Sequence, residues 1–119
     1  MRHNRFWKFL DELVESSELV IDRPRGSTHP RYTDFIYPYD YGYLHGTISG
    51  DGQGIDIFVG SLQPRSVVGV DLQKRDSETK ILLGCHKEEM ETIIQVHNSE
   101  SFAGYLIVRG QEEEWSRIS

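Results

Sequence analysis

The chain has 119 residues, of which 37% are hydrophobic and 27% charged, a balance typical of a globular protein with its own core. This length predicts one domain over residues 1–119. The net charge of −6 argues against nucleic acid, and no stretch is long and apolar enough to span a membrane. The N-terminal residues lack the pattern of a signal peptide, and the single Cys85 indicates a reduced thiol. We therefore expect a cytoplasmic protein.

The N-terminal segment predicts an amphipathic helix from about Arg5 to Ser17, with Asn4 as its cap. Its hydrophobic residues recur at helical spacing, and charged residues fall on the opposite side. We expect the hydrophobic stripe to pack in the core, although it could instead form a contact between two copies of the chain. The stripe consists of Phe6, Trp7, Leu10, Leu13 and Val14.

A short strand at residues 19–21 and a basic loop at residues 23–31 are expected next. The loop holds three arginines, and its two prolines keep the flanking backbone extended or turning. Together with nearby backbone amides, these arginines could bind an anion. The alternative is a solvated loop. The arginines are Arg23, Arg25 and Arg31.

Residues 37–60 are rich in tyrosine and glycine and close on an apolar strand that Asp56 interrupts. Burying an unpaired carboxylate is costly, so we expect Asp56 to meet a cation, a basic side chain or solvent. Residues 51–54 have the composition of a turn, which places Asp51 at the mouth of the strand. The two carboxylates could converge near the surface and offer the hard oxygens that Mg²⁺ prefers. The alternative is a plain hairpin with both aspartates in solvent.

The remaining elements complete a mainly β pattern. Strands are expected at residues 67–72 and 79–83, joined by a charged hairpin at 74–78. A second helix at 87–96, a strand at 102–108 and a loose acidic tail from residue 111 follow. Five or six short strands with two helices predict an α+β fold: a small, partly open β-barrel with flanking helices.

Two linked motifs in residues 37–60 resemble the signature of the family I soluble inorganic pyrophosphatases. Residues 37–43 read Tyr-Pro-Tyr-Asp-Tyr-Gly-Tyr, where the family has Tyr-Pro-x-Asn-Tyr-Gly and an aromatic residue. Residues 51–56 read Asp-Gly-Gln-Gly-Ile-Asp, where the family has Asp-Gly-Asp-Pro-x-Asp. The spacing between the motifs agrees, and residues 20–32 resemble the opening strand of the family. The resemblance covers residues 19–84 and implies an OB-like barrel.

This resemblance implies an enzyme that needs Mg²⁺, or Mn²⁺ in its place, and hydrolyses inorganic pyrophosphate or a related small diphosphate. The motif positions also imply which residues form the site, with Asp22 at its margin and Asp76 as a further carboxylate. The metal would be held by Asp51, Asp56 and Glu78; phosphate would contact Arg31, Tyr41 and Lys80; and the catalytic set would be Asp51, Gln53, Asp56 and Tyr41.

Several departures from the family pattern imply a truncated, divergent member with impaired hydrolysis. Gln53 replaces an aspartate that orients or deprotonates the attacking water, and an amide cannot accept a proton. Gly54 replaces a proline, and a hairpin that carries a phosphate-binding arginine is missing between Tyr32 and Tyr37. A C-terminal Tyr-Lys pair is also missing. The alternatives are a non-catalytic domain that binds a phosphorylated ligand or partner, and a structural barrel without a metal site.

Overall fold

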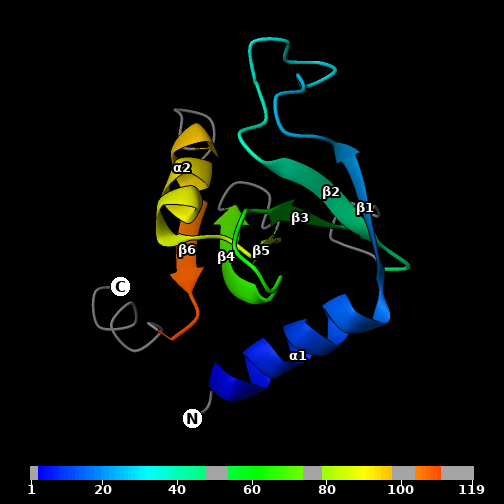
Figure 1. Ribbon diagram of the computed structural model, residues 1–119, viewed down its shortest axis with the longest axis vertical. Helices are drawn as coiled ribbons and strands as arrows, with labels where there is room; N and C mark the ends of the chain where they lie inside the picture. The colour runs from blue at the N-terminus through cyan, green and yellow to red at the C-terminus, as the bar shows by residue number, and fades with distance from the viewer. Residues whose placement is uncertain (1–2, 48–53, 74–78, 98–103, 111–119) are drawn as a thin grey trace.

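The computed structural model describes residues 3–47, 54–73, 79–97 and 104–110. Within them, no helix is long and apolar enough to cross a membrane. Figure 1 shows the arrangement of the elements. Their bounds are α1 His3–Ser16, β1 Glu18–Arg23, β2 Asp40–His45, β3 Ile55–Val59, β4 Val67–Gln73, β5 Thr79–Leu83, α2 Lys87–His97 and β6 Gly104–Val108.

The six strands form one sheet in the order β1-β2-β3-β5-β4-β6. All neighbouring strands are antiparallel except β3 and β5, which run parallel. The first and last strands of this order do not pair with each other in the described part of the chain, so the sheet is not closed. The predicted mainly β, partly open barrel with flanking helices is confirmed.

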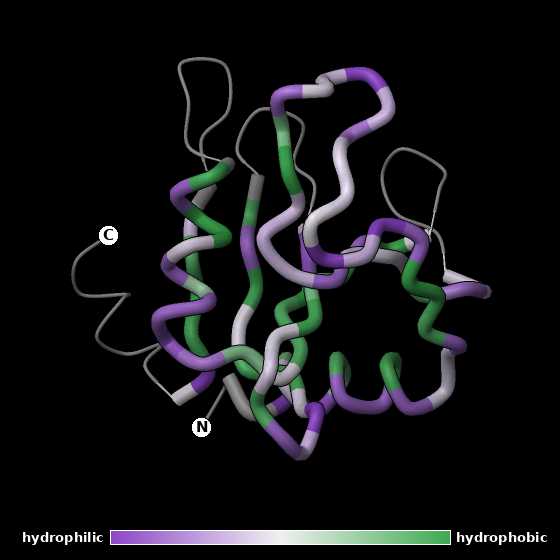
Figure 2. The backbone as a smooth tube through the Cα atoms, turned by 45° about the horizontal axis from the view of Figure 1, so that its top comes forward, coloured by the Kyte–Doolittle hydropathy of each residue, from purple (hydrophilic) through white to green (hydrophobic). Residues whose placement is uncertain are grey.

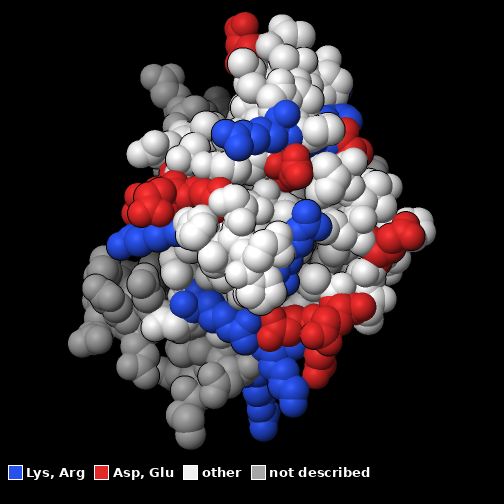
Figure 3. Space-filling view, in the orientation of Figure 1, with Lys and Arg blue, Asp and Glu red and all other residues white. Residues whose placement is uncertain are grey.

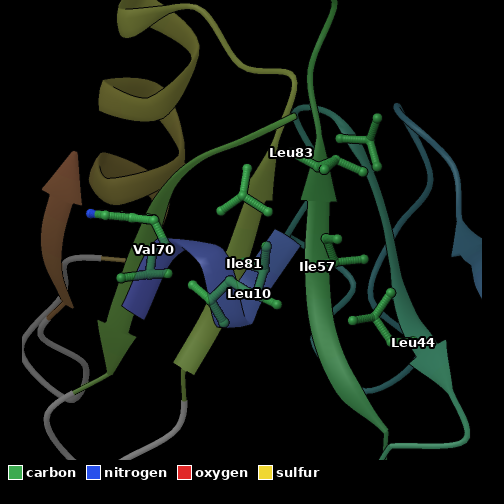
Figure 4. Close-up of a cluster of buried hydrophobic side chains, with 9 residues drawn as sticks. Leu10, Leu44, Ile57, Val70, Ile81 and Leu83 are labelled. Atoms are coloured by element: carbon green, nitrogen blue, oxygen red, sulfur yellow. The ribbon is translucent and has the colours of Figure 1, made fainter. Parts of the chain in front are cut away.

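One face of the sheet packs against α1. Side chains two residues apart on a strand point to the same face, so β3 and β5 send alternate residues toward this helix. Trp7 and Leu10 of α1 are buried there. Figure 4 shows the centre of this cluster, and Figure 2 shows the hydrophobic side of α1 turned toward the sheet. The strand residues fully or almost fully buried in it are Leu44, Ile57, Val59, Val67, Val70, Ile81 and Leu83.

The opposite face packs against α2 and the loop between β1 and β2. Phe58 and Leu82 point to this face and are fully buried with Met90 and Ile93 of α2 close to them. Cys85 is buried in the same cluster, and burial raises the pKa of its thiol to about 12. The thiol is therefore a packing group in its neutral form.

Most predicted elements match, with three corrections. Helix α1 begins at His3, two residues before the predicted start, so the predicted cap Asn4 lies inside it. Phe6 is 42% exposed rather than buried, because it lies at the edge of the hydrophobic stripe; its ring and that of Trp7 meet in a T-shaped contact. Strand β2 had no predicted counterpart. The charged hairpin at 74–78, the start of the strand predicted from residue 102 and the tail from residue 111 lie outside the described residues.

Candidate functional site

Three polar side chains come together on the α2 face of the sheet, one from each of three neighbouring strands. Asp56 precedes the buried Phe58 by two residues and Lys80 precedes the buried Leu82 by two, so both share their face. Tyr41 pairs with Phe58 in the register of β2 and β3. The parallel pairing of β3 with β5 therefore brings Lys80 next to Asp56, and β2 adds Tyr41 on the other side.

Lys80 links this cluster. Its Nζ lies 3.0 Å from Asp56 Oδ2 and 3.0 Å from the Tyr41 hydroxyl oxygen. The side chains of Lys80 and Asp56 are 15% and 24% exposed, so the ion pair is partly shielded from water but can still be reached. An ammonium group has three N–H donors. Among the described residues two of them are used by these contacts, which leaves the third to donate to a ligand oxygen.

Tyr41 is held in its neutral form. Burial raises the pKa of its hydroxyl well above the usual range, and the negative charge of Asp56 and a hydrogen bond with that carboxylate raise it further. The ring stacks on Tyr37 at 5.0 Å between centroids and meets Phe58 edge-on at 4.7 Å. A ring packed on both sides keeps its hydroxyl in place, so Tyr41 presents a fixed, protonated donor beside Lys80 and Asp56.

Asp22 lies near this cluster, at the bulge where the pairing of β1 with β2 shifts register. Its carboxylate is exposed, and Arg23 approaches it at 4.0 Å. Its negative charge also raises the pKa of Tyr41, after the larger effects of burial and Asp56. The structure thus places Asp22 at the margin of the cluster, where the sequence resemblance puts an acidic residue.

Arg31 lies in the loop between β1 and β2, which extends beyond the end of the sheet (Figure 1). Its side chain is exposed. The turn around it is fixed by His29, whose Nδ1 accepts hydrogen bonds from the backbone N–H groups of Arg31 at 3.0 Å and Tyr32 at 3.1 Å. Among the described contacts, Arg31 does not touch Tyr41 or the residues bound to it. Its role as a phosphate ligand stays a prediction.

Thr47 connects β2 and β3 through its side chain, a contact that the sequence analysis missed. Its Oγ1 donates to a β2 carbonyl at 2.6 Å and accepts from the backbone N–H of Ile55 at 2.9 Å. It thereby joins the two ends of segment 48–53, which carries Asp51 and Gln53 and lies outside the described residues. The available signal was a threonine placed just before a glycine-rich turn.

The described residues hold only part of the predicted metal site. No group of three or more His, Cys, Asp or Glu side chains within them could hold a metal ion. Asp51, Glu78 and Asp76 lie outside them. Asp56 offers hard oxygens that suit Mg²⁺, but Lys80 already binds one of them. A divalent cation here therefore needs further negative groups, from other carboxylates or from an anionic ligand.

Comparisons with known proteins find a short sequence match and several similar solved structures. No model of a known protein family matches the chain. A segment of 33 residues is 42% identical to an inorganic pyrophosphatase from Aeropyrum pernix, and this match covers 28% of the chain and 19% of that relative. Similar solved structures are an inorganic phosphatase from Anaplasma phagocytophilum (TM-score 0.51, 15% identity) and inorganic pyrophosphatases from Helicobacter pylori (0.52, 14%) and Neisseria gonorrhoeae (0.53, 22%).

The chain has the fold of the inorganic pyrophosphatases. The three structural likenesses cover 76%, 76% and 84% of the chain and 81%, 81% and 84% of the respective structures. They therefore extend over three quarters or more of the chain, whereas the sequence match is confined to one segment of 33 residues. The predicted OB-like barrel is confirmed.

Proposed function

We propose that this chain is a divergent family I inorganic pyrophosphatase that binds pyrophosphate or a related small diphosphate together with Mg²⁺, and hydrolyses it slowly. Mn²⁺ could replace Mg²⁺. The fold, the 33-residue match and the sequence signature support this proposal. The observation that carries it is Lys80, whose ammonium lies 3.0 Å from both Asp56 and Tyr41 on one face of that fold.

The roles of the residues follow from the needs of phosphoryl transfer, which depends on positioning and charge neutralisation more than on covalent chemistry. Lys80 would donate its third N–H to a phosphate oxygen, and Tyr41 would contact the same phosphate by turning its one O–H from Asp56 to a phosphate oxygen. Arg31 would add positive charge from the loop. Mg²⁺, when bound, would neutralise phosphate charge and lower the pKa of a water molecule. Its protein ligands would be Asp51, Asp56 and Glu78.

Gln53 favours a second candidate, a domain that binds a diphosphate without hydrolysing it. A positioned general base is typically worth about a hundredfold to ten-thousandfold in rate, and an amide cannot serve as one. Binding needs only the cation, the basic side chains and the hydroxyl. The two candidates therefore share a ligand and differ in turnover. A purely structural barrel would show neither.

The test is Mg²⁺-dependent release of phosphate from pyrophosphate and from nucleoside diphosphates, comparing wild type with Lys80→Met. The variant keeps an unbranched side chain that is one atom shorter and removes its charge. We expect its rate to fall by about a hundredfold or more, the usual effect of losing one preorganised electrostatic contact. Lys87→Met, at an exposed position of α2, is the matched control and should not change the rate.

Three outcomes separate the candidates. Phosphate release that Lys80→Met abolishes supports the slow hydrolase. Binding of a non-hydrolysable diphosphate without any release supports the non-catalytic domain. A rate equal in wild type and Lys80→Met would remove the cluster from the active site.

A further inference from the structure

The exposed charges of α1 are arranged against its helix dipole. The first turn has no acidic residue and the last turn has no basic residue. Arg5 and Lys8 are instead exposed in the N-terminal half, and Glu12 and Glu15 in the C-terminal half. A helix N-terminus carries partial positive charge and a C-terminus partial negative charge, so this order costs stability in an isolated helix. Among the described residues, these four side chains form no ion pair.

The same side of α1 exposes a large hydrophobic side chain. Phe9 is 60% exposed, and the neighbouring Phe6 is 42% exposed. Arg5, Phe9 and Glu12 follow one another at i, i+4 and i+7, so they form one stripe along the helix, which we call the outer stripe. Figure 3 shows basic and acidic groups adjacent to each other in the lower part of the molecule, where Figure 1 places α1.

We propose that α1 pairs antiparallel with α1 of a second copy of this chain through the outer stripe. Arg5 and Glu12 lie equally far from the point between Lys8 and Phe9. A two-fold axis through this point places Arg5 of each copy opposite Glu12 of the other, and it brings the two Phe9 rings together at the centre. A two-fold contact repeats each pairing twice, so one stripe supplies two ion pairs.

Antiparallel pairing also removes the unfavourable order of charges. The basic half of each helix then lies beside the acidic half and the negative C-terminal end of the other helix. A parallel pair would instead set Arg5 against Arg5 and Glu12 against Glu12. A single pair of helices buries less than the roughly 1,600 Å² of a standard interface. The dimer is therefore weak and depends on protein concentration.

The test is sedimentation equilibrium of the full chain over a range of concentrations. Arg5→Glu should raise the dissociation constant by roughly tenfold, since it creates two like-charge contacts in place of two ion pairs. Glu12→Arg should do the same. The double variant Arg5→Glu/Glu12→Arg should return to near the wild-type value, and Phe9→Glu should leave only monomer. Lys87→Glu on α2 is the control, with no change expected.

Circular dichroism of each variant verifies that α1 still folds, and the double reversal should fold at least as well because its charges agree with the dipole. Wild type that stays monomeric at the highest concentration would overturn the proposal. So would a double reversal that fails to restore the dimer. Binding of monomeric wild type to anionic vesicles, lost in Phe9→Glu, would assign the outer stripe to a membrane surface and also overturn it.

Discussion

Two opposing effects act on the charged form of Lys80: burial disfavours it, and pairing with an opposite charge favours it. A lysine whose side chain is only 15% exposed loses part of the hydration of its ammonium, which costs free energy unless an opposite charge and acceptors replace water. Asp56 supplies the charge and Tyr41 supplies a second acceptor. Replacing Asp56 alone would leave the ammonium with a neutral partner. Asp56 and Tyr41 therefore hold the ammonium of Lys80 close to the surface, where an anion can reach it.

Gln53 gives the first prediction at this scale, on a residue that only the sequence resemblance places in the site. If it stands where a water-activating carboxylate is needed, Gln53→Asp should raise Mg²⁺-dependent pyrophosphate hydrolysis by about tenfold or more. The gain stays partial because the missing arginine hairpin is not restored and transition-state charge remains under-compensated. Phosphate release at saturating Mg²⁺ measures the effect.

Gln95→Asp, at an exposed position of α2, makes the same chemical change outside the site and should not alter the rate. No increase in a Gln53→Asp protein that still binds Mg²⁺ and diphosphate would favour the non-hydrolytic domain. Wild type as fast as an intact pyrophosphatase would show that Gln53 does not limit the reaction.

At the scale of elements, Glu89 attaches α2 to the loop that follows β3. Its carboxylate accepts hydrogen bonds from the backbone N–H of His86 at 2.7 Å and from that of Ser61 at 3.2 Å. Burial alone would raise its pKa, but these hydrogen bonds and the nearby His86 outweigh burial, so the pKa of Glu89 is lowered. Gly60 permits this approach, since a Cβ there would lie 2.7 Å from a carboxylate oxygen of Glu89.

This arrangement predicts a stability that depends on pH. The pKa of Glu89 is lower in the folded chain than in the unfolded one, so its contribution is complete above the ordinary glutamate value of about 4.3 and is lost as pH falls through the folded value. Glu89→Gln should lower the free energy of unfolding at pH 7 by about 1–3 kcal/mol. The difference from wild type should shrink in acid.

Urea unfolding at neutral and acidic pH measures this difference. Glu91→Gln is the control, because Glu91 is an exposed glutamate of the same helix. Equal losses in the two variants would show that the hydrogen bonds of Glu89 contribute nothing beyond ordinary surface charge.

The sequence predicted the helices and strands whose hydrophobic residues recur with a clear period. It missed strand β2, which lacks such a period. Alternation of polar and apolar residues indicated β4 and β5, and helical spacing indicated both helices. Strand β2 carries Tyr41, Gly42 and Tyr43, in which glycine interrupts any pattern of side chains. The structure supplies the reason for that glycine: a Cβ on Gly42 would collide with the backbone of Val20 in β1. Close approach of two strands cannot be inferred from one of them.

At the scale of the whole molecule, the order of strands assembles the candidate site. Lys80 lies 39 residues from Tyr41 and 24 from Asp56, and it reaches them because β5 inserts between β3 and β4. An aspartate in an apolar strand predicted a cation, a basic side chain or solvent, and local patterns could not choose among them. The parallel pairing of β3 with β5 places a basic side chain, that of Lys80, next to Asp56.

The last prediction uses the stability of the whole chain to detect the ligand without any turnover. A ligand that binds only the folded state stabilises it by about 2.7 kcal/mol at a hundred times its dissociation constant. For a chain of this length, that corresponds to a rise in Tm of roughly 10 °C. We expect this rise with Mg²⁺ and imidodiphosphate together, measured by scanning calorimetry in wild type and in the Lys87→Met control.

Mg²⁺ alone should shift the Tm far less, because the Lys80 ammonium bound to Asp56 repels a divalent cation until an anion offsets both charges. In Lys80→Met we expect the opposite changes: the rise in Tm with Mg²⁺ alone should be larger than in wild type, and the rise with imidodiphosphate should be smaller. A Tm that neither ligand moves in wild type would leave the structural barrel as the remaining interpretation. A full shift with imidodiphosphate and no metal would place the anion on the basic side chains alone.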